Sequence, residues 1–316
     1  MAPRLDPPAM AAITLTLRAD QLLAAGTRAL ARDEVPHLLL RGPAIAQWVY
    51  TAEERRPYID ADLLVPEPLV ERAGGALRAA GFEPLLEDAA PAEQAPHART
   101  FRAPGEGGTI DLHWTLRGVG APPDAVWEGL REGAGAIDVA GTSVAVPSEH
   151  GRALIVALHA AQHGPTGRVP LRDVELALQR VDPSVWRQAA ALAERLDATA
   201  GFAAGLRLAP GGARLLEEMS IGARPTIDLA LRAQGEVPLA LSLAKLAETK
   251  GASTKLGMLG RELWPTPAYM RRWHPLAGKG TGGMLAARFY RPLWLAARTP
   301  AALRALRRAR RTRRES

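Results

Sequence analysis

The pattern of apolar and polar positions in the first 116 residues changes repeatedly between helical and extended spacing. Apolar residues at helical spacing, bounded by glycines or prolines, predict helices over 12–32, 44–54 and 66–82. Short apolar or alternating runs indicate strands over 35–43, 59–65, 82–88, 99–104 and 109–116, with a loop over 89–98. Helices that alternate with strands in this way predict an α/β unit built around a mixed sheet.

The second half of the chain has a simpler pattern. Residues 137–148 predict a hairpin with its turn at Gly141-Thr142, and strand signals nearly vanish after that. Helical periods follow over 149–164, 171–181, 183–209 and 238–250. We therefore predict an α+β protein in three parts: a mixed sheet flanked by helices over 1–148, an all-helical domain over 149–287 and a basic tail over 288–316.

Two aspartates interrupt the predicted strand 59–65. Asp60 and Asp62 are spaced i, i+2, so both carboxylates point to one face of the strand, where they repel each other. A divalent cation such as Mg²⁺, which prefers carboxylate oxygens, would offset this repulsion and then bind the phosphates of a substrate. In the strand 109–116, Asp111 is the only carboxylate, and it shares a face with His113 while Trp114 faces the core. If this strand pairs beside 59–65, the three acids converge; otherwise Asp111 is a polar residue on a solvated face.

The composition narrows the possible chemistry. The chain has no cysteine, which excludes a disulfide, a thiolate metal site and a cysteine nucleophile. Its N-terminus lacks the pattern of a signal peptide and no window predicts a transmembrane helix, so we expect a cytoplasmic protein. The net charge of +7 is concentrated in residues 288–316, which hold ten arginines and one glutamate, while the rest of the chain is nearly neutral.

Several motifs together resemble a known family. The runs "LLLRGPAIAQWVY", "RPYIDADLLVPEPLVERAGGALRAAGFE" and "TIDLHWTL", followed by "ALIVALHAAQHG" and "LRDVELAL", are similar to the uncharacterised nucleotidyltransferase family of bacteria. The resemblance extends over roughly residues 25–300, and its most specific part is the Arg-Pro-x-x-Asp-x-Asp-Leu-Leu-Val run.

This resemblance implies the fold of the DNA polymerase β-like nucleotidyltransferase superfamily. It also implies transfer of a nucleoside monophosphate from an NTP, with Mg²⁺ (or Mn²⁺) held by Asp60, Asp62 and Asp111. Asp111 would then deprotonate or orient the attacking hydroxyl. The acceptor is open: a small molecule, a protein hydroxyl or an RNA 3′ end.

The residues expected to bind the nucleotide depart partly from the family pattern. The wider superfamily favours Gly-Ser where this chain has Gly42-Pro43, and Pro43 offers neither an N–H nor a hydroxyl to a triphosphate. Arg41 replaces the lysine that is common in the family and can still pair with phosphate as a planar donor. Arg56 of the Arg-Pro motif and Arg172, after the loop 164–170, are further candidates for binding the nucleotide, although Arg172 could simply pair with Asp173.

Two histidines spaced i, i+4 lie on one face of the predicted helix 149–164. His159 and His163 are compatible with three roles: packing in a domain interface, contact with the nucleotide, or a metal site in which Asp173 is a third ligand or orients an imidazole. His113 could approach the metal centre, but we favour a supporting role in which it holds Asp111.

The basic tail has three interpretations: a solvated disordered end, an RNA-binding segment, or a contact with an anionic membrane surface. The leading hypothesis for the whole chain is a Mg²⁺-dependent nucleotidyltransferase. The alternatives are a catalytically inactive NTP-binding or scaffold protein of the same fold, and a helical RNA-binding module that depends on the arginines.

Overall fold

A computed structural model describes residues 7–51, 53–85, 97–105, 108–235 and 238–315. Most of the predicted loop 89–98 and the end of the predicted strand 82–88 lie outside these residues. The chain divides into two compact units, and every candidate site residue lies in the first, which includes 97–163 and 167–222. Among the described residues, no helix combines the length and the apolar character needed to cross a bilayer.

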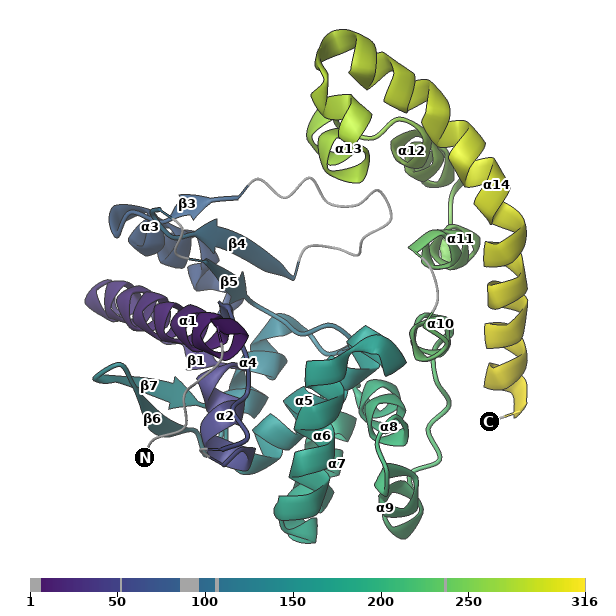
Figure 1. Cartoon of the computed structure of the whole chain (residues 1–316). Helices are drawn as coiled ribbons and strands as arrows, with labels where there is room; N and C mark the ends of the chain where they lie inside the picture. The colour runs from purple at the N-terminus through teal and green to yellow at the C-terminus, as the bar shows by residue number, and fades with distance from the viewer. Residues whose placement is uncertain (1–6, 52, 86–96, 106–107, 236–237, 316) are drawn as a thin grey trace. The chain divides into compact units, whose positions relative to one another are not determined.

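A five-stranded mixed sheet lies at the centre of the first unit, with strand order β1-β2-β5-β4-β3 (Figure 1). Only β2 and β5 run parallel; the other neighbours are antiparallel. The strands are β1 (Leu38–Leu39), β2 (Asp60–Leu64), β3 (Glu83–Pro84), β4 (Ala98–Arg102) and β5 (Thr109–His113). The predicted α+β class with a mixed sheet is therefore confirmed.

One face of this sheet forms the core of the first unit. Helices α1 (Pro7–Arg32) and α3 (Val70–Ala79) pack on that face, where Leu63 and Leu112 are fully buried (Figure 1). The alternation along β5 explains the arrangement, because Ile110 and Leu112 join this core while Asp111 and His113 point to the other face. Gly81, two residues after the end of α3, has φ of 88° and stops the helix, which is the role predicted for it.

The remaining elements of the first unit are mostly helical. The hairpin of β6 (Gly135–Val139) and β7 (Thr142–Val146) turns at Ala140-Gly141, one residue before the predicted Gly141-Thr142. The helices are α2 (Pro43–Val49), α4 (Pro123–Arg131), α5 (Glu149–His163), α6 (Arg168–Arg180), α7 (Pro183–Arg195), α8 (Thr199–Arg207) and α9 (Gly212–Glu218), with the short 3-10 turn η1 (Glu67–Leu69). The 3-10 turn η2 (Gly164–Thr166), between α5 and α6, is grouped with the second unit.

Two features of this region differ from the prediction. The helical period over 183–209 is broken between α7 and α8, where Asp197 takes a φ of 49°, in the left-handed region. Helix α4, which begins at Pro123, lies in a stretch for which the sequence analysis predicts no element. Helices do begin at Glu149, but contacts group the helices up to residue 218 with the sheet rather than with the later ones.

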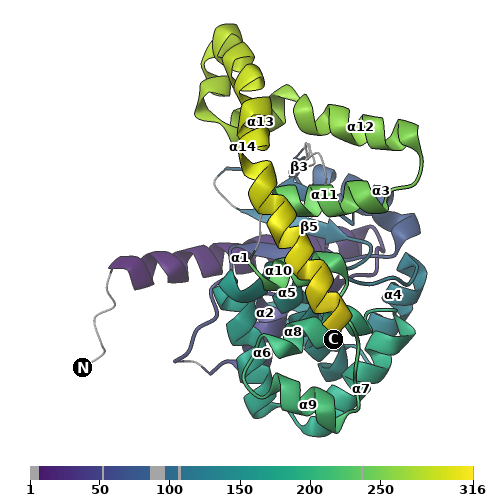
Figure 2. The same ribbon diagram turned by 90° about the vertical axis from the view of Figure 1, so that its right-hand side faces the viewer.

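In the described residues of the second unit, every regular secondary-structure element is a helix. Its helices are α10 (Ile227–Ala233), α11 (Pro238–Glu248), α12 (Ala252–Leu263), α13 (Pro267–Trp273) and α14 (Gly280–Glu315), with the 3-10 turn η3 (Pro275–Gly278). Both views show α14 running alongside α10 and α11 (Figures 1 and 2). Leu295, Ala302 and Leu306 of α14 share a core with Ile227 of α10 and Leu239 of α11.

The structure corrects the interpretation of residues 288–316 as a solvated disordered end. They continue α14 through Glu315, and part of their surface is buried in the core of the second unit. Even one of the arginines is internal: Arg291 is buried, donates to the backbone and side chain of Glu262 on α12, and lies against the ring of Trp273.

Candidate active site

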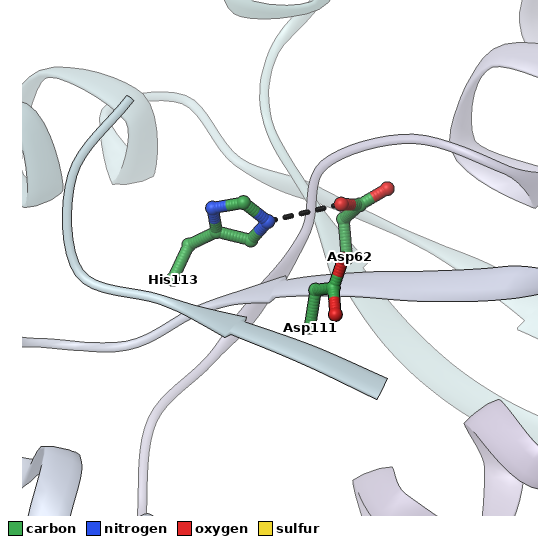
Figure 3. A group of neighbouring side chains, drawn as sticks. All are labelled: Asp62, Asp111 and His113. Carbon is green, nitrogen blue, oxygen red and sulfur yellow. Dashed lines mark hydrogen bonds and ion pairs between the residues drawn. The ribbon is translucent and has the colours of Figure 1, made fainter. Parts of the chain in front are cut away.

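The register of β2 against β5 brings two carboxylates together. Asp62 is the direct partner of Asp111 in the parallel pair, so the two side chains lie next to each other on the face opposite the core. Figure 3 shows Asp62, Asp111 and His113 converging. One potential ligand atom from each of the three lies within 4.8 Å of the other two.

Asp62 is the most engaged of these carboxylates. It is buried, and both of its oxygens accept hydrogen bonds from the guanidinium of Arg41, with Nε 2.8 Å from Oδ2. The Nε2 of His113 lies 2.9 Å from Oδ1 of Asp62 and donates to it (Figure 3). The partner of His113 is therefore Asp62, and not Asp111 as the sequence interpretation favours.

The surroundings of Asp62 keep it ionised. Burial alone would raise the pKa of its carboxyl group, but the charge of Arg41 and the hydrogen bond from His113 lower that pKa well below the ordinary value. Arg41 gains in return: burial opposes its charge, but Asp62, Asp60 and Asp111 together raise the pKa of the guanidinium. Both groups are therefore charged at neutral pH and form an ion pair.

Asp60 stands in a different electrostatic position. Burial, and then the negative charge of Asp62, raise the pKa of Asp60, while Arg41 acts in the opposite direction. Among the described residues, the tight group of three potential ligands contains His113 and not Asp60. Asp60 is thus electrostatically coupled to Asp62 and Asp111 but is less closely packed against them.

These residues fit a divalent cation. Three carboxylates share the single positive charge of Arg41, which leaves two negative charges when all three are ionised. Carboxylate oxygens from two adjacent strands are the ligands that Mg²⁺ and Mn²⁺ prefer. A cation bound to Asp62 would have to share that carboxylate with Arg41 or displace the guanidinium.

Asp111 has a partner that the sequence analysis does not include. The hydroxyl of Thr100, which faces Asp111 across the β4–β5 pair, donates to its Oδ1 at 2.6 Å. This hydrogen bond fixes one oxygen of Asp111 and leaves the other available for a ligand. Thr100 lies in an ordinary strand pattern, so only the register identifies it.

The turn after β1 carries the predicted phosphate contacts. Gly42 has φ of 63° and ψ of −120°, a conformation that favours glycine, and it immediately precedes Pro43, the first residue of α2. The backbone N–H of Leu40 donates to the carbonyl of Asp62, so this turn is joined directly to β2. Arg41 and Gly42 are therefore held beside the carboxylates.

His159 lies near the site, whereas His163 is at the surface. The two rings meet edge-on with centroids 4.6 Å apart. Burial, followed by the charge of Arg41, lowers the pKa of His159 well below the ordinary value, so its ring is neutral. Its buried Nδ1 has no hydrogen-bond partner among the described residues.

Arg56 and Asp173 form a pair that the sequence analysis does not predict. Both are buried, with Nε of Arg56 2.8 Å from Oδ1 and Nη2 2.7 Å from Oδ2 of Asp173; the hydroxyl of Tyr50 also donates to Oδ1. Asp173 therefore pairs with neither Arg172 nor the two histidines of α5. Because the guanidinium of Arg56 is committed to this pair, its predicted contact with the nucleotide has no support in the geometry.

Arg172 is half exposed and lies 3.3 Å from Glu54 and 3.6 Å from Glu175. It remains a surface candidate for phosphate binding.

A further histidine, His97, lies near the site although the sequence analysis does not predict it there. The centroid of its ring lies 5.5 Å from that of His113, and its Nε2 accepts a hydrogen bond from Arg117. Burial and the charge of Arg117 lower the pKa of His97 to about 4.

A mixed sheet whose parallel strands present paired carboxylates, beside a glycine turn and an arginine, defines a nucleotidyltransferase-type α+β protein. The comparison with protein families agrees, because the family described as uncharacterised nucleotidyltransferase matches residues 9–211, more than half of the chain. The chain belongs to this family, which confirms the resemblance found in its motifs.

Solved structures give more distant similarities. The solution structure of the antibiotic-resistance factor ANT(2'')-Ia is 16% identical, with 57% of this chain and 93% of that chain covered and a TM-score of 0.41. The crystal structure of an antigenic nucleotidyltransferase-like protein from Paracoccidioides brasiliensis is 14% identical, with 58% and 92% covered and a TM-score of 0.34. A comparison with curated proteins finds no match.

Proposed function

We propose that this protein transfers a nucleoside monophosphate from an NTP to an acceptor hydroxyl, with Mg²⁺ (or Mn²⁺) bound by Asp60, Asp62 and Asp111. The observation that carries the proposal is the pairing of Asp62 with Asp111 in the β2–β5 register, which aligns two carboxylates on one face. The cation supplies positive charge that neutralises the phosphates and stabilises the negative charge developing during transfer.

The remaining steps are proton transfer and binding of the triphosphate, and we assign them to residues of the chain. The acceptor oxygen forms a bond to the α-phosphorus, the bond from that phosphorus to the bridging oxygen breaks, and pyrophosphate leaves with the electron pair. Asp111 accepts the proton of the acceptor hydroxyl through the oxygen that Thr100 does not hold. Arg41 and Gly42, which lie beside the carboxylates, would contact the triphosphate, and the neutral ring of His159 would contribute to the same site.

The acceptor is a small molecule, a protein hydroxyl or an RNA 3′ end. A direct test incubates the purified full chain with each NTP, radiolabelled at the α-phosphate, and Mg²⁺, first alone and then with candidate acceptors. We expect transfer of label and release of pyrophosphate. Asp111→Asn should lower the rate by about 10²–10⁴-fold because the proton acceptor is lost. Asp33→Asn, an exposed aspartate away from the site, is the matched control.

A second candidate function rests on a specific observation. Asp62 already accepts hydrogen bonds from Arg41 and His113, and Pro43 offers no N–H to a phosphate, which favours an inactive protein that binds NTP or acts as a scaffold. Tight NTP binding without transfer of label to any acceptor, unchanged by Asp111→Asn, would support this alternative over the enzyme.

A further inference from the structure

The side of α14 that faces away from the core of the second unit is unusually apolar in its first half. Leu285, Phe289 and Leu293 are spaced i, i+4, i+8 and are 53%, 64% and 69% exposed. Leu303 continues this outer face with 40% exposure, and a helix advances about 27 Å between Leu285 and Leu303. Single exposed leucines are ordinary, but a continuous row indicates an interaction site.

The second half of the same face is cationic. Arg304, Arg307 and Arg310 are exposed and follow Leu303 along the helix. Glu315, near the end of the helix, is the only acidic residue in the sequence of α14. We use "outer face of α14" for Leu285, Phe289, Leu293 and Leu303 together with Arg304, Arg307 and Arg310.

The opposite side of α14 fixes which residues are exposed. Ala287, Leu295, Ala302, Ala305, Leu306 and Ala309 are buried, and most of them contact α10 and α11. This inner side supplies the helix with its core contacts, and the outer-face residues are not among the buried core residues of the second unit; Phe289 contacts only the half-exposed Trp264 among the aromatic rings of the described residues. The row of large apolar side chains on the outer face is therefore unexplained by folding of that unit.

We propose that the outer face of α14 binds an anionic phospholipid surface. A bilayer interface accepts both halves at once: the apolar row enters the boundary between headgroups and acyl chains, and the arginines pair with headgroup phosphates. Tyr290 is 45% exposed, and Trp264 of α12, 49% exposed, packs edge-on against Phe289; both are residue types enriched at membrane interfaces. RNA phosphates would engage the arginines but offer no partner to exposed leucines, so lipid fits the face better than nucleic acid does.

Co-sedimentation of the full chain with vesicles tests this proposal. We expect binding to phosphatidylcholine vesicles that contain phosphatidylglycerol, little binding to phosphatidylcholine alone, and weakening with added salt. Replacing Leu285, Phe289 and Leu293 together by Gln should reduce binding at least about tenfold. Replacing Arg304, Arg307 and Arg310 together by Gln should reduce vesicle binding by at least as much, because each arginine lost should weaken binding about fivefold.

Leu17→Gln is the matched control, since Leu17 on α1 is 57% exposed and lies in the first unit. Circular dichroism of each variant establishes that α14 and the rest of the chain remain folded. The proposal is overturned if the wild type does not sediment with anionic vesicles, or if the apolar triple variant binds them as well as the wild type does. Binding to single-stranded RNA without binding to vesicles, or a dimer that the apolar variant dissociates, would equally replace lipid by another partner.

Discussion

Arg41 pairs with Asp62, one of the carboxylates that are expected to hold the metal ion. The sequence predicts that a cation must offset the crowding of carboxylates on β2 and β5, and in the structure the guanidinium supplies part of that charge. Arg41, which is predicted to bind phosphate, is thus already paired with Asp62, which is predicted to bind the metal. Substrate binding would require Arg41 to exchange the carboxylate for phosphate.

Replacing Arg41 by Met should destabilise the protein in the presence of EDTA. Removing one partner of a buried ion pair leaves the other charge uncompensated and typically costs about 3 kcal/mol or more; Asp62 is buried, although Arg41 itself retains some exposure. Thermal unfolding followed by circular dichroism measures the loss, and Mg²⁺ or Mn²⁺ should restore part of it. Arg41→Lys keeps the charge without the planar fork and should lose less. Equal melting temperatures for wild type and Arg41→Met would contradict this role.

Whereas the Arg41 guanidinium stabilises the folded protein, the ionised carboxylate of Asp60 should destabilise it at neutral pH. Its folded-state pKa is raised, so above that pKa the charged group disfavours folding, and below the unfolded value of 3.8 the penalty is absent. In metal-free buffer, Asp60→Asn should therefore stabilise the chain near pH 7, with the gain shrinking as the pH falls toward 4. Urea unfolding at several pH values measures this difference, and a variant less stable than wild type at pH 7 would refute it.

At the scale of the elements, the sequence predicts the two strands that matter but not their pairing. Alternation along 109–116 places Asp111 and His113 on one face, and the spacing of Asp60 and Asp62 does the same for β2. Which strands are neighbours, and in which register, depends on contacts between residues 51 positions apart, such as Asp62 and His113, that local periodicity does not encode. The same limit hides the hydrogen bond from Thr100 to Asp111.

The pair of Arg56 and Asp173 illustrates long-range contacts between elements. Asp173 lies on α6, and Arg56 lies in the segment before β2, so their ion pair ties the helices after residue 149 to the sheet. The sequence motif suggests that Arg56 binds substrate, whereas its buried ion pair with Asp173 is a contact that only the structure reveals.

Asp173→Asn should therefore destabilise the protein by about 3–5 kcal/mol, because it leaves Arg56 buried without a counter-charge. The neighbouring change Arg172→Gln is the matched control: its pairs are exposed and should contribute within about 0.5 kcal/mol. Chemical denaturation compares the two. If Arg172 contacts the triphosphate, Arg172→Gln raises the KM for NTP without lowering the melting temperature. An Asp173→Asn variant as stable as Arg172→Gln would show that the buried pair is dispensable.

At the scale of the whole molecule, the composition shows where the positive charge is concentrated but does not predict that this charged segment is folded. Residues 288–316 hold ten arginines, and density of like charge suggests a disordered end. The alternation of buried alanines and leucines with exposed arginines shows instead that α14 is part of a folded unit. Alanine carries too weak an apolar signal for the sequence pattern to reveal this inner face.

The central claim is that the carboxylates of β2 and β5 form one cation site for a nucleotide. Electron paramagnetic resonance of Mn²⁺, with a non-transferable NTP analogue present, tests it most directly. We predict that the wild type removes the signal of free Mn²⁺, and that Asp62→Asn and Asp111→Asn each weaken binding at least about tenfold while Asp33→Asn does not. Binding of Mn²⁺ that is equally tight in all four proteins, or undetectable in the wild type, would contradict the claim.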